Sequence, residues 1–231
     1  MKLATRRRRI ALPGGGAVSA VVALPAGFRQ PGRIPAVILA HGAGGDMTSS
    51  FVSAMHSGLA REGYVAVKFN FPYTEGRRRV PDPRPVLERC YRAVVDAVSA
   101  DRTLAPPWVA IGGKSLGGRI ASYLVASGAP ARGLVFLGYP LHPAGRPETL
   151  RGDHLPNVPV PMLFVQGTRD TLCDLDRLRG VLTRLPRATL HVIEGGDHSF
   201  RLPRRAGQSE EEVWAEIVAV TARWLRRIGG S

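Results

Sequence analysis

The chain has 231 residues, of which 44% are hydrophobic and 22% are charged. This length is enough to bury a core as one domain, and no apolar run approaches the roughly 18 residues that a membrane span needs. Lysine and arginine outnumber aspartate and glutamate by 32 to 18, but only three of the 32 are lysines and the arginines are scattered along the chain. Because we find no zinc-finger spacing and no DNA-reading helix, we expect a solvated basic surface, with neither nucleic acid nor membrane as a partner.

Two features of the sequence bear on its compartment. Cys90 and Cys173 are too few for a disulfide scaffold or a cysteine-built zinc site, which favours free thiols in a reducing compartment. The first 28 residues have the charge of a secretory or twin-arginine signal, but Pro-Gly-Gly-Gly at 13–16 interrupts the apolar stretch and favours a turn. We therefore expect a hairpin of two strands, 9–12 and 17–24, and a cytoplasmic protein.

From residue 34 onward, short apolar runs alternate with stretches of helical periodicity. The pattern predicts strands at 34–40, 64–71, 108–112, 134–138, 162–167 and 189–194. It predicts helices at 48–61, 85–101, 116–127, 174–185 and 210–228. Such alternation indicates a mostly parallel sheet covered by helices on both faces, in a single domain 1–231 with a short insertion at 141–161. Ligands of such sheets bind at the carboxyl ends of the strands.

The strongest chemical signal is Gly-Lys-Ser-Leu-Gly-Gly at 113–118, between a predicted strand and a predicted helix. A strained turn in this position forces Ser115 outward, and the small residues on either side leave room for neighbouring backbone. The N-terminus of the following helix favours negative charge near the serine. The alternative is an ordinary glycine-rich turn, but the strand–turn–helix context favours a nucleophile elbow.

A serine nucleophile needs a base and a group that orients the base, and in this arrangement both come later in the chain. His198 follows the last predicted strand, and Asp170 follows the strand at 162–167. Both loops should emerge beside Ser115, so we predict Ser115, Asp170 and His198 as a catalytic triad. The weaker alternatives are His142, His154, His191, Asp174, Asp176 and Asp197, of which Asp174 and Asp176 suit helix capping.

The oxyanion of a tetrahedral intermediate needs backbone donors. Leu116, directly after the nucleophile, should supply one N–H group, and the glycine-rich loop 41–45 should supply the other. We assign Ala43 as this second donor, with Gly44 as the alternative, and expect His41 to fix the loop. A plain turn is the competing interpretation of residues 41–45.

These motifs together resemble small α/β hydrolases of the dienelactone-hydrolase-like type, particularly the branch related to testis-expressed protein 30. The matching segments span nearly the whole chain in order: 39–44, 69–73, 112–119, 138–143, 164–170 and 195–200. The resemblance implies an α/β-hydrolase fold, with a minimal cap and poorly defined substrates. It also implies that some relatives have degenerate triads and act as subunits of complexes. Serine stands where dienelactone hydrolases proper have cysteine, so their lactone substrate does not carry over.

The insertion is short and polar, which argues against a lipase with a large apolar lid. Further arginines lie in loops expected near the catalytic edge: Arg77–Arg79, Arg169, Arg201 and Arg204. Some of them could attract an anionic acyl or leaving group, or they could simply be solvated. The candidates for substrate contact are Gly44, Tyr73, Arg169 and Arg201.

We therefore predict a serine carboxylesterase or thioesterase that acts on small soluble acyl compounds through an acyl-enzyme at Ser115. It would need no metal and no organic cofactor, and it would be a monomer or homodimer. The alternatives are a non-catalytic binding or scaffold protein with the same fold, and an acyltransferase that uses the same site.

Overall fold

The computed structural model describes residues 3–203 and 207–230 and is built around one eight-stranded sheet in the order β1-β2-β4-β3-β5-β6-β7-β8. The strands are β1 (Ala4–Ala11), β2 (Ala17–Leu24), β3 (Ala36–Ala40), β4 (Val65–Phe69), β5 (Val109–Lys114), β6 (Leu134–Leu137), β7 (Met162–Gly167) and β8 (Ala188–Ile193). Strands β3 to β8 pair in parallel, and β1 and β2 add an antiparallel hairpin at one edge. The predicted mostly parallel sheet is confirmed.

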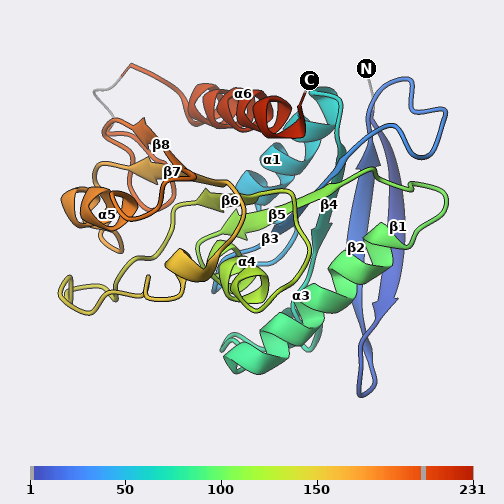
Figure 1. Cartoon of the computed structure of the whole chain (residues 1–231), viewed down its shortest axis with the longest axis horizontal. Helices are drawn as coiled ribbons and strands as arrows, with labels where there is room; N and C mark the ends of the chain where they lie inside the picture. The colour runs from blue at the N-terminus through green and yellow to red at the C-terminus, as the bar shows by residue number, and fades with distance from the viewer. Residues whose placement is uncertain (1–2, 204–206, 231) are drawn as a thin grey trace.

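Helices cover both faces of this sheet (Figure 1). On one face lie α1 (Ser50–Arg61) and α6 (Glu210–Gly229), and on the other lie α3 (Arg84–Ser99) and α4 (Leu116–Ala126). Each pair of helices buries its own hydrophobic cluster against the sheet, and α5 (Leu175–Leu182) adds its buried side chains to the cluster of α3 and α4. The two clusters make the sheet the middle layer of three.

The local sequence explains why the strands are central and where the helices begin and end. All residues of β3 and β7 are buried, as expected for apolar strands covered on both faces. Helix α6 begins with a capping box in which Ser209 and Glu212 bond each other's backbone N–H groups, and it ends at Gly230, whose φ of 82° is the left-handed conformation that glycine allows.

The structure corrects the predicted hairpin. The first strand begins at Ala4, not at residue 9, so Arg6–Arg9 lie within β1. Seven of the eight side chains of β1 are exposed or half-buried, so the strand lacks the apolar alternation that reveals most strands. Its arginines find partners nearby: Arg9 pairs with Glu75 at 2.7 Å, and Arg6 bonds the hydroxyl of Thr103 at 3.2 Å.

Two short elements were not predicted from the sequence. Helix α2 (Pro72–Glu75) follows β4, which ends at Phe69 and not at residue 71 as expected. A single 3-10 turn, η1 (Leu155–Asn157), lies in the otherwise irregular chain between β6 and β7. That chain contains the predicted insertion 141–161, which is held to α4 by a 2.7 Å bond between His154 Nε2 and Ser122 Oγ.

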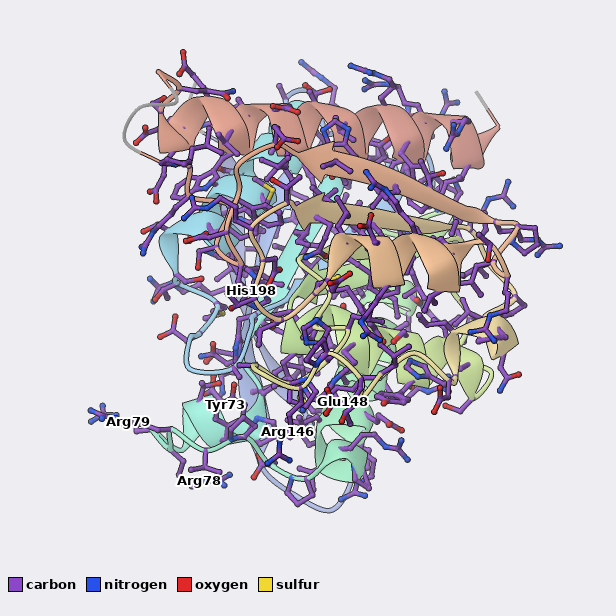
Figure 2. All side chains as sticks on the ribbon, turned by 90° about the vertical axis from the view of Figure 1, so that its left-hand side faces the viewer. Tyr73, Arg78, Arg79, Arg146, Glu148 and His198 are labelled. Carbon is purple, nitrogen blue, oxygen red and sulfur yellow. The ribbon has the colours of Figure 1, made fainter. Side chains whose placement is uncertain are left out.

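The loops after β3, β5, β7 and β8 leave the sheet at the carboxyl ends of parallel strands and therefore share one edge. Figure 2 shows the side on which His198 lies, with Tyr73, Arg78 and Arg79 below it and Arg146 and Glu148 from the insertion beside them. In the described residues, no helix is long and apolar enough to cross a bilayer.

Candidate active site

Ser115 stands in a strained turn between β5 and α4. Its φ of +49° and ψ of −111° are unusual for a residue with a side chain, and such conformations cost about 1–3 kcal/mol. The turn fits only because its neighbours are small: a Cβ atom on Gly113 would lie 2.2 Å from the carbonyl oxygen of Ala40, and one on Gly117 would lie 2.5 Å from the same oxygen. The predicted elbow geometry is therefore present, with Ser115 at the pocket.

The structure brings Ser115, His198 and Asp170 into one hydrogen-bonded chain. The Ser115 hydroxyl lies 2.9 Å from His198 Nε2, and His198 Nδ1 lies 2.7 Å from Asp170 Oδ2. With the ring proton on Nδ1, His198 donates to the carboxylate and its Nε2 accepts from the serine hydroxyl. This is the arrangement in which an imidazole can take the hydroxyl proton.

The carboxylate of Asp170 is itself held by two further donors. Gln166 Nε2 donates to its Oδ2 at 2.6 Å, and the backbone N–H of Leu172 donates to its Oδ1 at 2.8 Å. Gln166 is fixed in turn because its Oε1 accepts the backbone N–H of Tyr139 at 2.9 Å. Since the Asp170 side chain is fully buried, these bonds replace the water that it has lost.

The two proposed oxyanion donors border the same pocket as Ser115. Leu116 is the first residue of α4, so its N–H group has no partner within the helix. Ala43 belongs to the loop after β3, where His41 acts as the expected brace: its Nδ1 lies 2.9 Å from the carbonyl of Gly42, and its Nε2 accepts the N–H of Phe71. Burial lowers the pKa of His41 below its usual range, which keeps this brace neutral.

The alternatives to the triad residues have other partners. His142 accepts the N–H of Asp174, His191 pairs with Glu216, and His154 bonds Ser122. The carboxylate of Asp174 caps α5 through the N–H of Arg177, and that of Asp197 holds its own loop through the N–H groups of Ser199 and Arg201. The exposed Asp176 pairs with Arg179 along α5.

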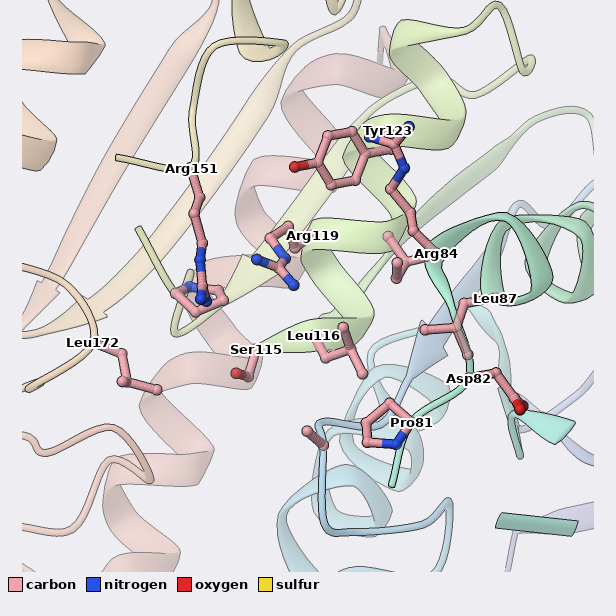
Figure 3. Close-up of a pocket in the computed structure, with 13 residues that line it drawn as sticks. Pro81, Asp82, Arg84, Leu87, Ser115, Leu116, Arg119, Tyr123, Arg151 and Leu172 are labelled. Carbon is pink, nitrogen blue, oxygen red and sulfur yellow. The ribbon is translucent and has the colours of Figure 1, made fainter. Parts of the chain in front are cut away.

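The pocket at Ser115 has a volume of about 360 Å³, which is at the small end for a ligand site. Its lining includes three arginines, Arg84, Arg119 and Arg151, which Figure 3 shows above and beside Ser115. Sequence reasoning missed all three, because Arg119 looked like an ordinary helix residue and Arg151 lies in the irregular insertion. Helical spacing is the signal that could have found Arg119, since it lies one turn after Ser115.

The four residues expected to contact substrate lie outside this lining. Gly44 and the buried Tyr73 border a separate hollow with Arg77, Arg78 and Arg79. Arg169 is exposed and donates to the carbonyl of Gly195, and Arg201 pairs with Glu210. Arg204 falls outside the described residues.

Lys114, directly before the nucleophile, is a further buried polar group that the sequence did not single out. Its Nζ has no hydrogen-bond partner in the described structure and lies 5.5 Å from the ring centre of Phe200. Burial lowers its pKa to about 8, although the nearby Asp170 and Asp197 act in the opposite direction.

No group of three or more histidine, cysteine, aspartate or glutamate side chains placed to hold a metal ion occurs in residues 3–203 and 207–230.

Comparison with known proteins agrees with the fold. A family model described as an alpha/beta hydrolase domain matches residues 33–226. Among solved structures, a dienelactone hydrolase from Anabaena variabilis is 17% identical with a TM-score of 0.74 over 98% of this chain and 99% of that one. A serine hydrolase without lid from Xanthomonas campestris is 21% identical, also with a TM-score of 0.74, over 98% and 96% of the two chains. At these identities the solved structures establish the shared fold, and the closer relation to the testis-expressed protein 30 branch stays a prediction.

Proposed function

The chain belongs to the α/β-hydrolase family, and from this premise we propose that it is a serine hydrolase that cleaves esters or thioesters of small acyl compounds. The observation that carries the proposal is the continuous chain of hydrogen bonds from Ser115 Oγ through His198 to the buried carboxylate of Asp170. The Ser115 hydroxyl has a base 2.9 Å away, and the imidazole ring of that base is held in a fixed orientation by Asp170. These are the two conditions for activating a serine nucleophile.

The reaction would proceed in two balanced halves. Ser115 Oγ attacks the carbonyl carbon while its proton passes to His198 Nε2. The tetrahedral intermediate then collapses with cleavage of the bond to the leaving group, which departs with that proton. Water attacks the acyl-enzyme in the same way, His198 again relays the proton, and the acid and free Ser115 are regenerated.

The remaining groups at the site would stabilise the charges that form during the reaction. The N–H groups of Leu116 and Ala43 would hold the oxyanion, aided by the N-terminus of α4. Asp170 would keep the ring proton of His198 on Nδ1 and stabilise the imidazolium, while Gln166 and the N–H of Leu172 hold that carboxylate in place.

The small pocket supports a short substrate, and the short chain between β6 and β7 leaves the pocket without a large apolar cover. We assign the reaction to the cytoplasm, on the basis that Cys90 and Cys173 are both free and buried.

The test is covalent labelling with a fluorophosphonate probe, followed by mass spectrometry of the labelled peptide. We expect wild type to be labelled at Ser115, and Ser115→Ala to remain unlabelled. Ser127→Ala, at the far end of α4, is the matched control and should label like wild type. A wild-type protein that resists the probe, or carries it elsewhere, would contradict the proposal and favour a non-catalytic binding role.

A further inference from the structure

The pocket beside Ser115 contains two arginines for which the proposed chemistry has no use. Arg119 lies on α4 and Arg151 lies in the chain between β6 and β7, and Figure 3 shows both side chains reaching into the space above Ser115. Neither is needed to activate the serine or to hold the oxyanion. Two cationic groups at a nucleophile call for a separate explanation.

Both guanidinium groups lack a carboxylate partner in the part of the chain that the structure describes. Arg119 is half-buried, and its Nε is fully buried without any hydrogen-bond partner. Arg84, the third arginine of the lining, makes a useful contrast, because it pairs with Glu88 at 3.1 Å and lies 4.6 Å from the ring centre of Tyr123. Asp82 also borders the pocket, but its carboxylate is bound to Arg78 at 2.7 Å.

The two cations are close enough to repel each other. Burial, and then the charge of Arg119, lower the pKa of Arg151 below its usual value. The same field reaches the neighbouring His154, whose pKa falls to about 4 through burial and the charges of Arg119 and Arg84. A buried donor without an acceptor and two like charges side by side both cost free energy, and a bound anion would remove both costs.

Backbone contacts fix the positions of both residues in the fold before any ligand arrives. The backbone carbonyl of Arg151 accepts a hydrogen bond from the Tyr139 hydroxyl at 2.7 Å. The backbone N–H of Arg151 donates to the carbonyl of Leu141 at 2.7 Å. Arg119 lies four residues after Ser115, in the first turn of α4, and its N–H donates to the Ser115 carbonyl at 3.1 Å, so it lies about 6 Å further along the helix axis. An anionic group held there would be separated by only a few bonds of the substrate from the carbonyl that Ser115 attacks.

We propose that the Arg119–Arg151 pair binds a doubly charged phosphate-type group on the non-reacting part of the substrate. The inference rests on the proposed hydrolase function and names the substrate class of the same site. Charge balance favours a dianion, since two guanidinium groups without acidic partners carry two positive charges and a carboxylate supplies only one negative charge. Guanidinium forks also match the oxygens of a phosphate through paired N–H···O bonds.

The test on the acyl side uses three ethyl esters that differ at one end: ethyl 4-phosphonobutanoate, monoethyl glutarate and ethyl pentanoate. The test on the leaving-group side compares 2-acetoxyethyl phosphate with neutral 2-methoxyethyl acetate. At pH 8 and constant ionic strength, we expect kcat/KM for the dianionic ester to exceed that of its neutral partner by about 10- to 100-fold on one of the two sides. The side that shows the preference identifies which part of the substrate carries the charge.

Arg119→Gln and Arg151→Gln should each lower kcat/KM for the dianionic ester far more than for its neutral partner, so that most of the preference is lost. Arg89→Gln is the matched control, since it removes one exposed arginine from α3, and it should keep the preference. Equal rates for dianionic and neutral esters on both sides would overturn the inference. So would a preference for the monoanionic glutarate over the phosphonate, or a preference that survives both arginine substitutions.

A binding measurement separates this inference from the proposed function. Calorimetric titration of Ser115→Ala with inorganic phosphate reads the arginine pair without turnover, and we expect saturable binding that Arg119→Gln and Arg151→Gln abolish. Suppose that neutral esters are hydrolysed, but inorganic phosphate does not bind and a phosphate-type group on the substrate does not increase kcat/KM. The hydrolase function is then supported and the inference is wrong. If phosphate binds at the pair but no ester is cleaved, the proposed function fails and the anion site remains.

Discussion

His56 and His198 lie on opposite halves of the central sheet, and their surroundings differ as much as the two halves do. His56, on α1, packs over the β1-β2-β4-β3 half, where its Nε2 meets the carbonyl of Val21 at 3.1 Å. His198 follows β8 in the β5-β6-β7-β8 half, where it bonds Asp170 on one side and Ser115 on the other. One ring is anchored to backbone, and the other joins two side chains across a pocket.

The difference extends beyond these two histidines. In the β1-β2-β4-β3 half, Arg7, Arg8 and Arg9 of β1 are exposed and Arg6 is half-buried. Arg6 and Arg9 have partners at the surface. In the β5-β6-β7-β8 half, Ser115 has a positive φ, and both Lys114 and Arg119 contain buried nitrogens without partners. A strained serine and two cationic groups with unpartnered nitrogens thus lie where the chemistry is proposed, as expected when a site is maintained at some cost in stability. The comparison predicts that the largest losses of activity come from changes in the β5-β6-β7-β8 half, and that removing an unpaired charge there raises stability.

The largest effect should come from Ser115→Ala. Serine substitution in such triads lowers kcat on the order of 10⁶-fold, and the variant should fold normally because the side chain is small. The measurement is kcat for p-nitrophenyl acetate together with the thermal midpoint. Substantial residual activity at wild-type stability would place the nucleophile elsewhere.

Asp170→Asn should rank second. The amide keeps the shape of the side chain but favours the wrong tautomer of His198, which lowers kcat by about 10⁴-fold in triads of this type. Steady-state kinetics with the same ester would measure the loss, with circular dichroism as the check on folding. A loss of less than about tenfold would mean that Asp170 does not orient the ring.

Lys114→Met tests whether the buried charge in the β5-β6-β7-β8 half lowers the stability of the folded state. The lysine pKa falls from 10.5 to about 8 on folding, so between these pH values the unfolded chain binds the extra proton and stability from this group rises with pH. At pH 7 the buried charge costs the folded state about 3 kcal/mol. We expect Lys114→Met to raise the free energy of unfolding at pH 7 by up to that amount, and the gain to shrink as pH rises from 8 to 10.5. Urea denaturation of wild type and variant at pH 7 and at pH 10 measures this difference. A variant that is less stable than wild type at both pH values would contradict the argument.

His56→Gln tests the other half. Burial, and then the charge of Lys68, lower the pKa of His56 from 6.5 to about 4, so this group contributes stability above pH 6.5 that is lost as the pH falls toward 4. Between pH 7.5 and 5 the wild type should lose about 2 kcal/mol from this residue. The glutamine variant should lose less over the same range, with kcat at pH 7.5 unchanged. Equal acid sensitivity of the two proteins in urea denaturation would remove His56 as the cause.

The smallest effect should come from Arg9→Gln. The pair with Glu75 is 2.7 Å long, but the arginine side chain is 61% exposed. Exposed pairs contribute less than about 1 kcal/mol, so both the thermal midpoint and kcat should stay close to those of wild type. A large loss of activity would break the division between the halves.

The sequence was most informative where backbone geometry dictates residue type. The elbow at Ser115 needs glycines at fixed positions, and the order serine, aspartate, histidine follows from the order of the strands, so all three could be assigned to one edge. Contacts between distant segments left no comparable pattern. Arg151 meets Arg119 only because the chain after β6 folds back over α4, and Gln166 reaches Asp170 only through the local path of the loop after β7. The sequence placed the start of β1 at residue 9 instead of Ala4 for a related reason. An edge strand with polar residues on both faces shows no period of two.

The arginines of β1 have a consequence for how copies of the protein meet. A strand with one neighbour exposes unpaired backbone groups to which a second chain could add. Two copies aligned along β1 would set four guanidinium groups against four others, and this repulsion would disfavour their pairing. Salt shortens the reach of such charges to about 8 Å at 0.15 M, so the barrier works at the last step of approach, where strand pairing would begin. We therefore expect Arg6–Arg9 to disfavour growth of the sheet by addition of further molecules at the β1 edge.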